Sequence, residues 1–358
     1  MTIKIEKPQF NIRETLRERD IPVGGHGSQV MQSKSLKETF NITKGGRRNL
    51  LVNGSFSVWQ RGNTFSGGGY TADQWKVETS GASITTTARE FTVGQKEVPG
   101  NSRYYLRYDV TTGADYSRLM QRMENVRNFD NVPITVSGWC KRSSGKATEC
   151  RIDLIYNYGS GGSSGGYDYD VASFFPSGRW EYFEYTFNTQ SMTGKTINDV
   201  DSSLEIRFGQ GSNTSSSPYR WNFANIQVEY GRGATPFEER PLSEEIALCQ
   251  RYCQRFPFPE PPVSAFGTGC GNGNQLGTHK GNDARVSLNI SSIPMRKTPT
   301  VTVYDGSGNQ NSVHEFSSGT TRTVSAIYPA GPNIGGYVQL TANSGNPVYV
   351  NVLANAEL

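Results

Sequence analysis

Two patterned segments enclose a long β-rich stretch of this chain and constrain what it can fold into. The opening segment, residues 49–62, reads NLLVNGSFSVWQRG, and the closing segment, residues 221–238, reads WNFANIQVEYGRGATPFE. Both are rich in the aromatic and branched residues that strands favour. We interpret them as the first and last strands of one domain, adjacent in space although far apart in sequence.

The enclosed stretch alternates between apolar and polar residues. Every second residue is apolar or glycine over 134–140, 150–156 and 183–187, which is the period of a half-buried strand. The sequence predicts further strands at 83–91, 103–110, 117–124, 204–208 and 222–229. Short strands in this number, joined by polar loops, predict a two-sheet jelly-roll β-sandwich over residues 49–240.

The composition also favours an all-β fold. Hydrophobic residues make up 34% and charged residues 19% of the chain, which holds 40 Gly, 18 Tyr and 17 Phe. Aromatic strand residues separated by Gly-rich turns are typical of this class. The predicted fold class is therefore all-β.

Three further regions flank the sandwich. Residues 1–48 form a leader with two short helices, which are too short to be stable alone. Residues 241–256 predict a linking helix, with Glu244 and Glu245 in its first turn, where they complement the helix dipole. Residues 257–358 predict a second, smaller β-sandwich domain, with strands at 285–290, 300–304, 323–328, 337–341 and 348–352.

Charge is concentrated in the leader. It carries ten Lys or Arg and five Asp or Glu, hence +5, whereas the whole chain carries +4. The leader therefore needs a partner surface. Its longest basic run is Arg47-Arg48, and no apolar stretch reaches the length of a membrane span. The sequence predicts neither nucleic-acid binding nor membrane insertion.

The cysteines predict no zinc site and no disulfide framework. Cys140 and Cys150 flank a Gly145 turn and would face each other if this segment were a hairpin. A chain made in a reducing cytosol is expected to keep them as thiols. Cys249 and Cys253 lie one helical turn apart and are expected to pack.

No catalytic motif stands out. The three histidines are isolated, and the chain lacks a Gly-x-Ser-x-Gly elbow and a phosphate-binding loop. Carboxylates that could form a glycosidase pair are present in the sandwich, but the sequence does not show that any two converge. We expect the protein not to be an enzyme.

The best binding candidate is aromatic. The segments 156–158, YNY, and 167–170, YDYD, flank a Gly/Ser-rich loop and would meet at one hairpin tip. Rings stack on sugar faces, and carboxylates bind sugar hydroxyls. The candidate glycan-binding residues are Tyr156, Tyr158, Tyr167, Asp168 and Tyr169.

The alternative is that alternate tyrosines pack into the sandwich, an expectation at least as strong for Tyr156 and Tyr169. The tryptophans are expected in the core or in interfaces rather than in a binding site. They are Trp59, Trp75, Trp139, Trp180 and Trp221.

The two end segments resemble those of carbohydrate-binding-module-type jelly rolls carried by tail fibres and related virion proteins of tailed phages. Residues 245–252, EIALCQRY, resemble a motif that follows the sandwich in such proteins, and residues 294–304, PMRKTPTVTVY, resemble their C-terminal module. The resemblance covers roughly residues 49–358. Its end motifs are distinctive, although the module family is broad.

The resemblance implies a phage virion protein, most simply a tail fibre made in the bacterial host cytoplasm. The leader would dock onto other virion proteins, and the outward part would bind host-surface glycan. The basic leader and thin β domains favour a homotrimer. No cofactor is expected. Structural calcium is common in resembling sandwiches, and the sequence identifies no ligands for it. The alternatives are a head decoration or head-fibre protein and a glycan-degrading enzyme.

Overall fold

The computed structural model describes residues 48–100, 102–112, 116–210 and 218–256, and, nearer the C-terminus, 274–278, 285–289, 294–305, 307–315, 321–329, 335–340 and 347–357. The predicted leader helices lie outside the described residues. So do the prolines that were expected to end the linking helix.

Two antiparallel six-stranded sheets form the sandwich, which confirms the all-β jelly roll. Sheet A has the order β1 (Thr64–Ser66), β4 (Ile84–Glu90), β5 (Tyr104–Val110), β12 (Tyr219–Tyr230), β7 (Pro133–Gly145) and β10 (Glu181–Asn188). Sheet B has the order β2 (Gly69–Tyr70), β3 (Lys76–Ser80), β6 (Tyr116–Glu124), β11 (Ser203–Gln210), β8 (Cys150–Asn157) and β9 (Gly166–Phe174). A 3₁₀ turn, η1 (Val126–Phe129), follows β6.

The core between the sheets is largely aromatic. Trp75 lies against Phe56 at 5.0 Å between ring centroids, and Trp221 lies against Tyr219 at 4.4 Å. Position 138 faces this core and has room only for glycine, since an added Cβ would lie 2.5 Å from Ile226 Cδ1. Ile134, Val136, Gly138 and Cys140 of β7 are all buried, as their alternation predicts.

The two end segments are adjacent, but the opening one is not a strand. The Leu50 amide donates to the Val228 carbonyl at 2.8 Å, and the Ile226 amide donates to the Gly54 carbonyl at 3.0 Å. The predicted first strand is wrong because Asn53 and Phe56 adopt positive φ angles of 58° and 55°, which bend the chain away from an extended path.

Cys140 and Cys150 do not face each other across a hairpin, the arrangement that the sequence left open. Cys140 lies on β7 in sheet A and Cys150 on β8 in sheet B, so the connection passes from one sheet to the other. Both side chains are buried and free of disulfides. Buried thiols of this kind act as small hydrophobes.

The linking helix is shorter than predicted. The helix α4 runs Leu242–Gln250, and Cys253–Phe256 forms the strand β13. β13 pairs in register with the last strand, Cys253 opposite Asn355. The short apolar run there fits either a helical or a strand period, and the available partner strand decides the outcome.

The remaining strands form a second β unit. They are β14 (Asn274–Thr278), β15 (Arg285–Asn289), β16 (Thr300–Tyr304), β17 (Ser312–Glu315), β18 (Thr321–Pro329), β19 (Gly335–Leu340) and β20 (Pro347–Asn355). β20 pairs with β13 and β16 along its second half and with β14 and β17 along its first half. Among its described residues, the buried hydrophobic side chains gather around Val303 and Val352.

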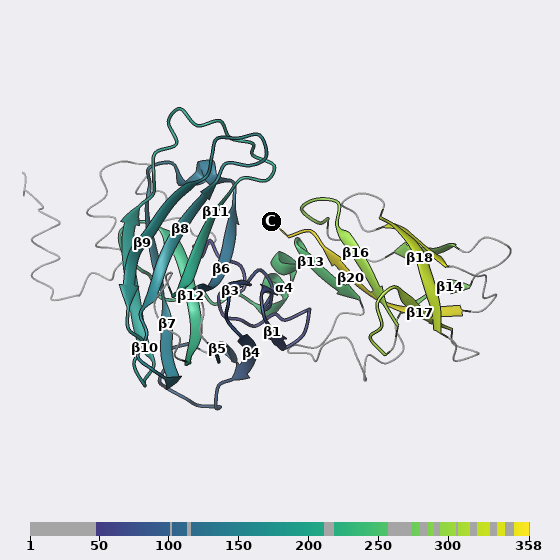
Figure 1. Ribbon diagram of the computed structural model, residues 1–358, viewed down its shortest axis with the longest axis horizontal. Helices are drawn as coiled ribbons and strands as arrows, with labels where there is room; N and C mark the ends of the chain where they lie inside the picture. Colours follow the sequence, from purple (N-terminus) through teal and green to yellow (C-terminus); the bar gives the residue numbers. More distant parts are fainter. Residues whose placement is uncertain are drawn as a thin grey trace, which may run out of the picture.

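Figure 1 shows the sandwich and the C-terminal unit side by side, with α4 and β13 between them and the chain end close to the junction. In the described part of the chain, no helix is both long and apolar enough to cross a membrane.

Candidate functional site

Two of the predicted binding tyrosines are buried, which corrects that prediction. Tyr156 on β8 is fully buried and points into the core. In the register of sheet B it lies between Leu204 of β11 and Gly166 of β9. Tyr158 is covered by the segment after β10: the Asn198 amide donates to its carbonyl at 2.8 Å. Neither ring can stack on an external sugar.

The Gly/Ser-rich loop between β8 and β9 is held by hydrogen bonds rather than projecting freely. The Ser160 hydroxyl donates to Asp201 Oδ2 at 2.6 Å, and the Thr196 amide donates to Ser163 Oγ at 2.9 Å. The bonds from Ser160 lower the pKa of Asp201. The loop and the 194–202 segment therefore form one packed end of the sandwich.

Asp168 also serves the interior. Its carboxylate accepts from the Tyr156 hydroxyl at 2.8 Å and from the Gln190 amide. The Tyr156 hydroxyl in turn accepts from the Gln190 backbone amide at 3.0 Å. Asp168 therefore fixes β9 to the segment after β10; it is half-buried, and its carboxylate is engaged by these bonds.

Tyr167 and Tyr169 are presented outward. They are 53% and 59% exposed, and their rings stack at 5.4 Å between centroids with 13° between planes. Residues i and i+2 of a strand share one face, and Tyr167 lies opposite Ile155 in the register. The pair forms a two-ring platform on the outer face of sheet B, at its β9 edge.

Charged residues continue this face beside the platform. Asp153 Oδ1 accepts from the Asp170 amide at 2.8 Å, and Arg151 Nε lies 3.0 Å from Glu149 Oε2 and 4.0 Å from Asp170 Oδ2. Asp170 has a positive φ of 55° at a break in the β8–β9 register. This bulge turns the strand beside the two tyrosines.

Farther across sheet B the charges form a network. Glu205 accepts from Arg122 at 2.7 Å and also from Arg207, and Glu78 lies 3.6 Å from Arg207 and 3.8 Å from Arg118. None of these residues was predicted as part of a site. Except for Glu78, which lies on the unpredicted strand β3, they alternate with the core residues of β6 and β11, and that alternation is the signal that could have found them.

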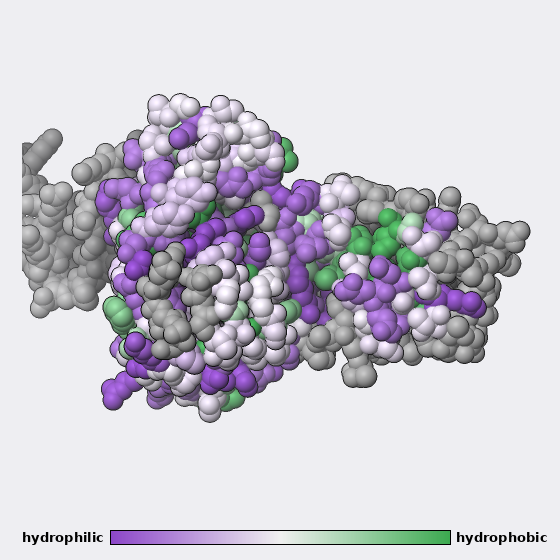
Figure 2. Space-filling view, in the orientation of Figure 1, coloured by the Kyte–Doolittle hydropathy of each residue, from purple (hydrophilic) through white to green (hydrophobic). Residues whose placement is uncertain are grey.

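Figure 2 shows the visible face of the sandwich as mostly hydrophilic to neutral, with hydrophobic residues gathered instead on the C-terminal unit. The outer face of sheet B carries the Tyr167 and Tyr169 rings at its β9 edge and paired charged groups beside them. Such a surface can contact both the apolar faces and the hydroxyls of a sugar.

The tryptophans divide into two groups. Trp59, Trp75 and Trp221 are core residues, as expected. Trp139 and Trp180 are half-buried outside the core cluster, on the far side of the sandwich.

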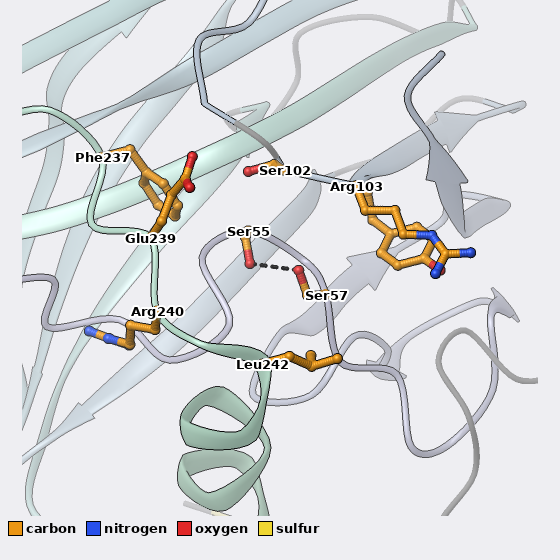
Figure 3. Close-up of a pocket in the computed structure, with 9 residues that line it drawn as sticks. Ser55, Ser57, Ser102, Arg103, Phe237, Glu239, Arg240 and Leu242 are labelled. Carbon is orange, nitrogen blue, oxygen red and sulfur yellow. Dashed lines mark hydrogen bonds between the residues drawn. The ribbon is translucent and has the colours of Figure 1, made fainter. Parts of the chain in front are cut away.

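A separate hollow of about 220 Å³ lies where the opening segment, the start of β5 and the segment before α4 meet (Figure 3). Ser55 and Ser57 line it and are hydrogen-bonded to each other at 2.9 Å. Phe237, Glu239 and Leu242 line the other side. None of the candidate glycan-binding residues lies in it.

Among the residues that the structure describes, no group of three or more His, Cys, Asp or Glu side chains is placed to hold a metal ion. Structural calcium, which backbone and amide oxygens can also bind, stays a prediction. His26 and His279, which were predicted to be isolated, lie outside the described residues.

No protein-family model matches the sequence, and no curated protein matches it. Among solved structures, the enzymatically active domain of tailspike protein 4 from bacteriophage CBA120 matches with a TM-score of 0.31 and 14% identity. That match covers 51% of this chain and 21% of the tailspike chain.

Two carbohydrate-binding modules also match. The CBM22-1 xylan-binding domain of Xyn10C from Paenibacillus barcinonensis has a TM-score of 0.32 and 13% identity, over 53% of this chain and 100% of that one. The family 11 module of Lic26A-Cel5E from Clostridium thermocellum has a TM-score of 0.27 and 18% identity, over 48% and 88%. These scores are too low to add to the jelly-roll assignment, which follows from the strand order of the two sheets.

Proposed function

We propose that this protein is a phage virion surface protein of the tail-fibre type that binds host-surface glycan through the outer face of sheet B. The observation that carries the glycan part is the exposed, stacked pair Tyr167 and Tyr169. The virion part is supported by the resemblance of the sandwich ends, of residues 245–252 and of residues 294–304 to phage fibre proteins.

The chemistry of the platform fits a sugar chain. The face of an aromatic ring carries negative charge density that attracts the polarised C–H groups on a sugar face. Arg151 and Asp170 lie beside the rings and supply a donor and an acceptor for hydroxyls. Because the Arg and Glu groups of the face are paired, it favours an uncharged or weakly charged glycan.

The test is adsorption of the full-length protein to an immobilised panel of bacterial surface polysaccharides. Tyr167→Ala with Tyr169→Ala should lower affinity at least about tenfold, a loss of about 1.4 kcal/mol, with an unchanged melting temperature. Phe175→Ala is the control, since Phe175 is 63% exposed and lies just beyond β9. Equal adsorption by all three proteins would remove the platform from the proposal.

The virion part has its own test. Antibody labelling of intact particles should mark the tail, whereas labelling of the capsid lattice would favour the head-fibre alternative. Light scattering after size exclusion should give a homotrimer. A monomer at micromolar concentration would contradict the assembly.

We also propose that binding occurs without cleavage. Incubation with a bound polysaccharide should release no reducing ends. Release that is lost when Asp153 or Glu205 is replaced would instead support a glycan-degrading enzyme.

A further inference from the structure

The outer face of sheet A, on the opposite side of the sandwich from Tyr167 and Tyr169, also carries aromatic rings. Trp180 lies 5.5 Å from both Phe91 and Tyr105 between ring centroids, and Trp139 lies 5.5 Å from Tyr182. Tyr182 is 46% exposed and the other four rings are half-buried. None of the five belongs to the hydrophobic core of the sandwich or packs against it.

The register places these rings across the sheet. Tyr182 pairs with Trp139, which pairs with Ala224, the small residue of β12 in that row. Tyr105 lies on the next strand and pairs with Arg89. With strands about 4.8 Å apart, the row from Tyr105 to Tyr182 extends about 14 Å, which is long enough to contact several sugar rings.

The composition of this face favours a sugar chain over a protein partner. The outward residues of β4, β5, β7, β10 and β12 in these rows include no Leu, Ile, Val or Met; they are Thr85, Thr87, Arg89, Tyr105, Arg107, Asp109, Ser137, Trp139, Lys141, Tyr182, Glu184, Thr186, Arg220, Asn222 and Ala224. Apart from Ala224, the apolar surface is therefore aromatic, and hydroxyl, amide and charged groups separate the rings.

Three ion pairs lie among the charges around the rings. Arg103 contacts Glu90 at 3.0 Å, Lys141 contacts Glu97 at 3.9 Å, and Arg220 contacts Asp109. The loop after β4 borders the rings and is fixed to β12, since Asn225 Nδ2 donates to the Pro99 carbonyl at 3.2 Å. The outward residues named above carry four basic and two acidic side chains, so this fixed aromatic row suits an uncharged or weakly acidic glycan.

We propose that the outer face of sheet A is a second glycan-binding surface, with Trp139, Trp180 and Tyr182 as its stacking residues. The inference rests on the proposed glycan binding and adds a second site to it. Two packed sheets are about 10 Å apart and their outer faces point in opposite directions, so a short oligosaccharide cannot reach both. One chain would then hold two glycan strands.

Tryptophan fluorescence separates the two faces. Trp59, Trp75 and Trp221 are buried in the core, and the outward residues of sheet B named above include no tryptophan. A ligand on sheet A should therefore change the emission of Trp139 and Trp180, whereas a ligand confined to Tyr167 and Tyr169 should leave it unchanged.

The probe is a set of short oligosaccharides released by mild hydrolysis from the polysaccharide that binds best on the panel. Calorimetry of the full-length protein should give two equivalents per chain, and saturation should shift the tryptophan emission. Trp139→Phe with Trp180→Phe should remove the shift with little effect on folding. Tyr182→Ala, at the most exposed of the five rings, should weaken the second equivalent several-fold.

The matched control is the Tyr167→Ala, Tyr169→Ala variant, which should keep the emission shift and bind one equivalent. The second site would be overturned if the wild-type protein bound one equivalent per chain without a change in emission and this binding were lost in the Tyr167→Ala, Tyr169→Ala variant. The proposed function would then still stand. If neither calorimetry nor fluorescence detected binding, both the second site and the proposed glycan binding would be overturned.

Discussion

At the scale of single residues, buried arginines hold the ends of the sandwich together. The Arg240 guanidinium donates to the Leu51 carbonyl at 3.0 Å and to the Asn49 carbonyl, and it lies 3.2 Å from Glu238 and 3.4 Å from Glu245. The side chain is almost fully buried. One cation thus forms ion pairs with two carboxylates and fixes the opening segment to the segment before α4.

Replacing Arg240 by Met should cost about 3–5 kcal/mol, because Glu238 and Glu245 would stay buried without their cation. Denaturant titration of the full chain measures this loss. The control is Arg103→Met, which breaks the exposed pair with Glu90 and should cost less than about 1 kcal/mol. Similar losses for the two variants would show that the buried pairing is not the cause.

Burial also predicts a pH dependence. Desolvation raises the pKa of Asp73, Glu245 and Glu357 above the ordinary values. A carboxyl whose pKa is higher in the folded than in the unfolded state binds its proton more tightly when folded, so acidification stabilises the fold. The stabilisation begins as the pH falls to the raised pKa values of the folded state. It is complete below the pKa values of the unfolded state, near 4.

The wild-type melting temperature should therefore rise on mild acidification by more than that of Glu357→Gln, which lacks one of the three groups. Groups with lowered pKa, such as Asp201, lose their contribution only at more acidic pH. Parallel profiles for the two proteins would argue against a raised pKa at Glu357.

At the scale of elements, most strands of the sandwich were predictable from the sequence. The strands at 84–90, 104–110 and 150–157 lie within a residue or two of their predictions. β3 was missed, and the opening segment was predicted as a strand although its apolar residues sit on an irregular path. That path depends on Asn53, whose side chain bonds the Val58 backbone and Asp73 carbonyl, and no periodicity encodes it.

The binding residues show the same limit. On β8, period two already places Tyr156 on the apolar face with Ile152 and Leu154. On β9 the same rule would turn Tyr167 and Tyr169 inward, whereas the structure exposes both. The register accounts for this, because Ile155 rather than Tyr156 lies opposite Tyr167.

The close approach of the opening segment to β12 gives an element-scale prediction. An added Cβ at Gly54 would lie 2.2 Å from the Ile226 carbonyl oxygen. Gly54→Ala should therefore push the two segments apart and cost about 1–3 kcal/mol in chemical denaturation. Gly178→Ala, where a Cβ meets nothing within 4 Å, is the matched substitution and should be close to neutral. A neutral Gly54→Ala would mean that the opening segment is free to shift.

At the scale of the whole molecule, a buried polar junction joins the sandwich to the C-terminal unit. Arg61 contacts Glu357 at 2.6 Å, and Gln60 Nε2 donates to the Cys253 carbonyl at 2.7 Å. Arg296 contacts Glu124 at 3.3 Å at the same junction. The last residues of the chain thus contact residues near the start of the sandwich.

This junction predicts that the two units unfold together. Calorimetry of the wild-type chain should show one transition, whereas Arg61→Met should leave Glu357 and Asp73 buried without their cation and split the transition in two. Arg127→Met, which breaks an exposed pair with Asp199, should keep a single transition. Two transitions in the wild type would show that the units are already independent.

The hydrogen bonds that join the opening segment to the residues before and at the start of α4 have a mechanical consequence. The Arg48 and Asn49 amides both donate to Glu238, and the Asn53 amide donates to Glu245 at the start of α4. Tension applied between the leader and the C-terminal unit would therefore pass through this short bridge rather than along the strands. Both sheets could stay relaxed while the ends of the chain are pulled in opposite directions.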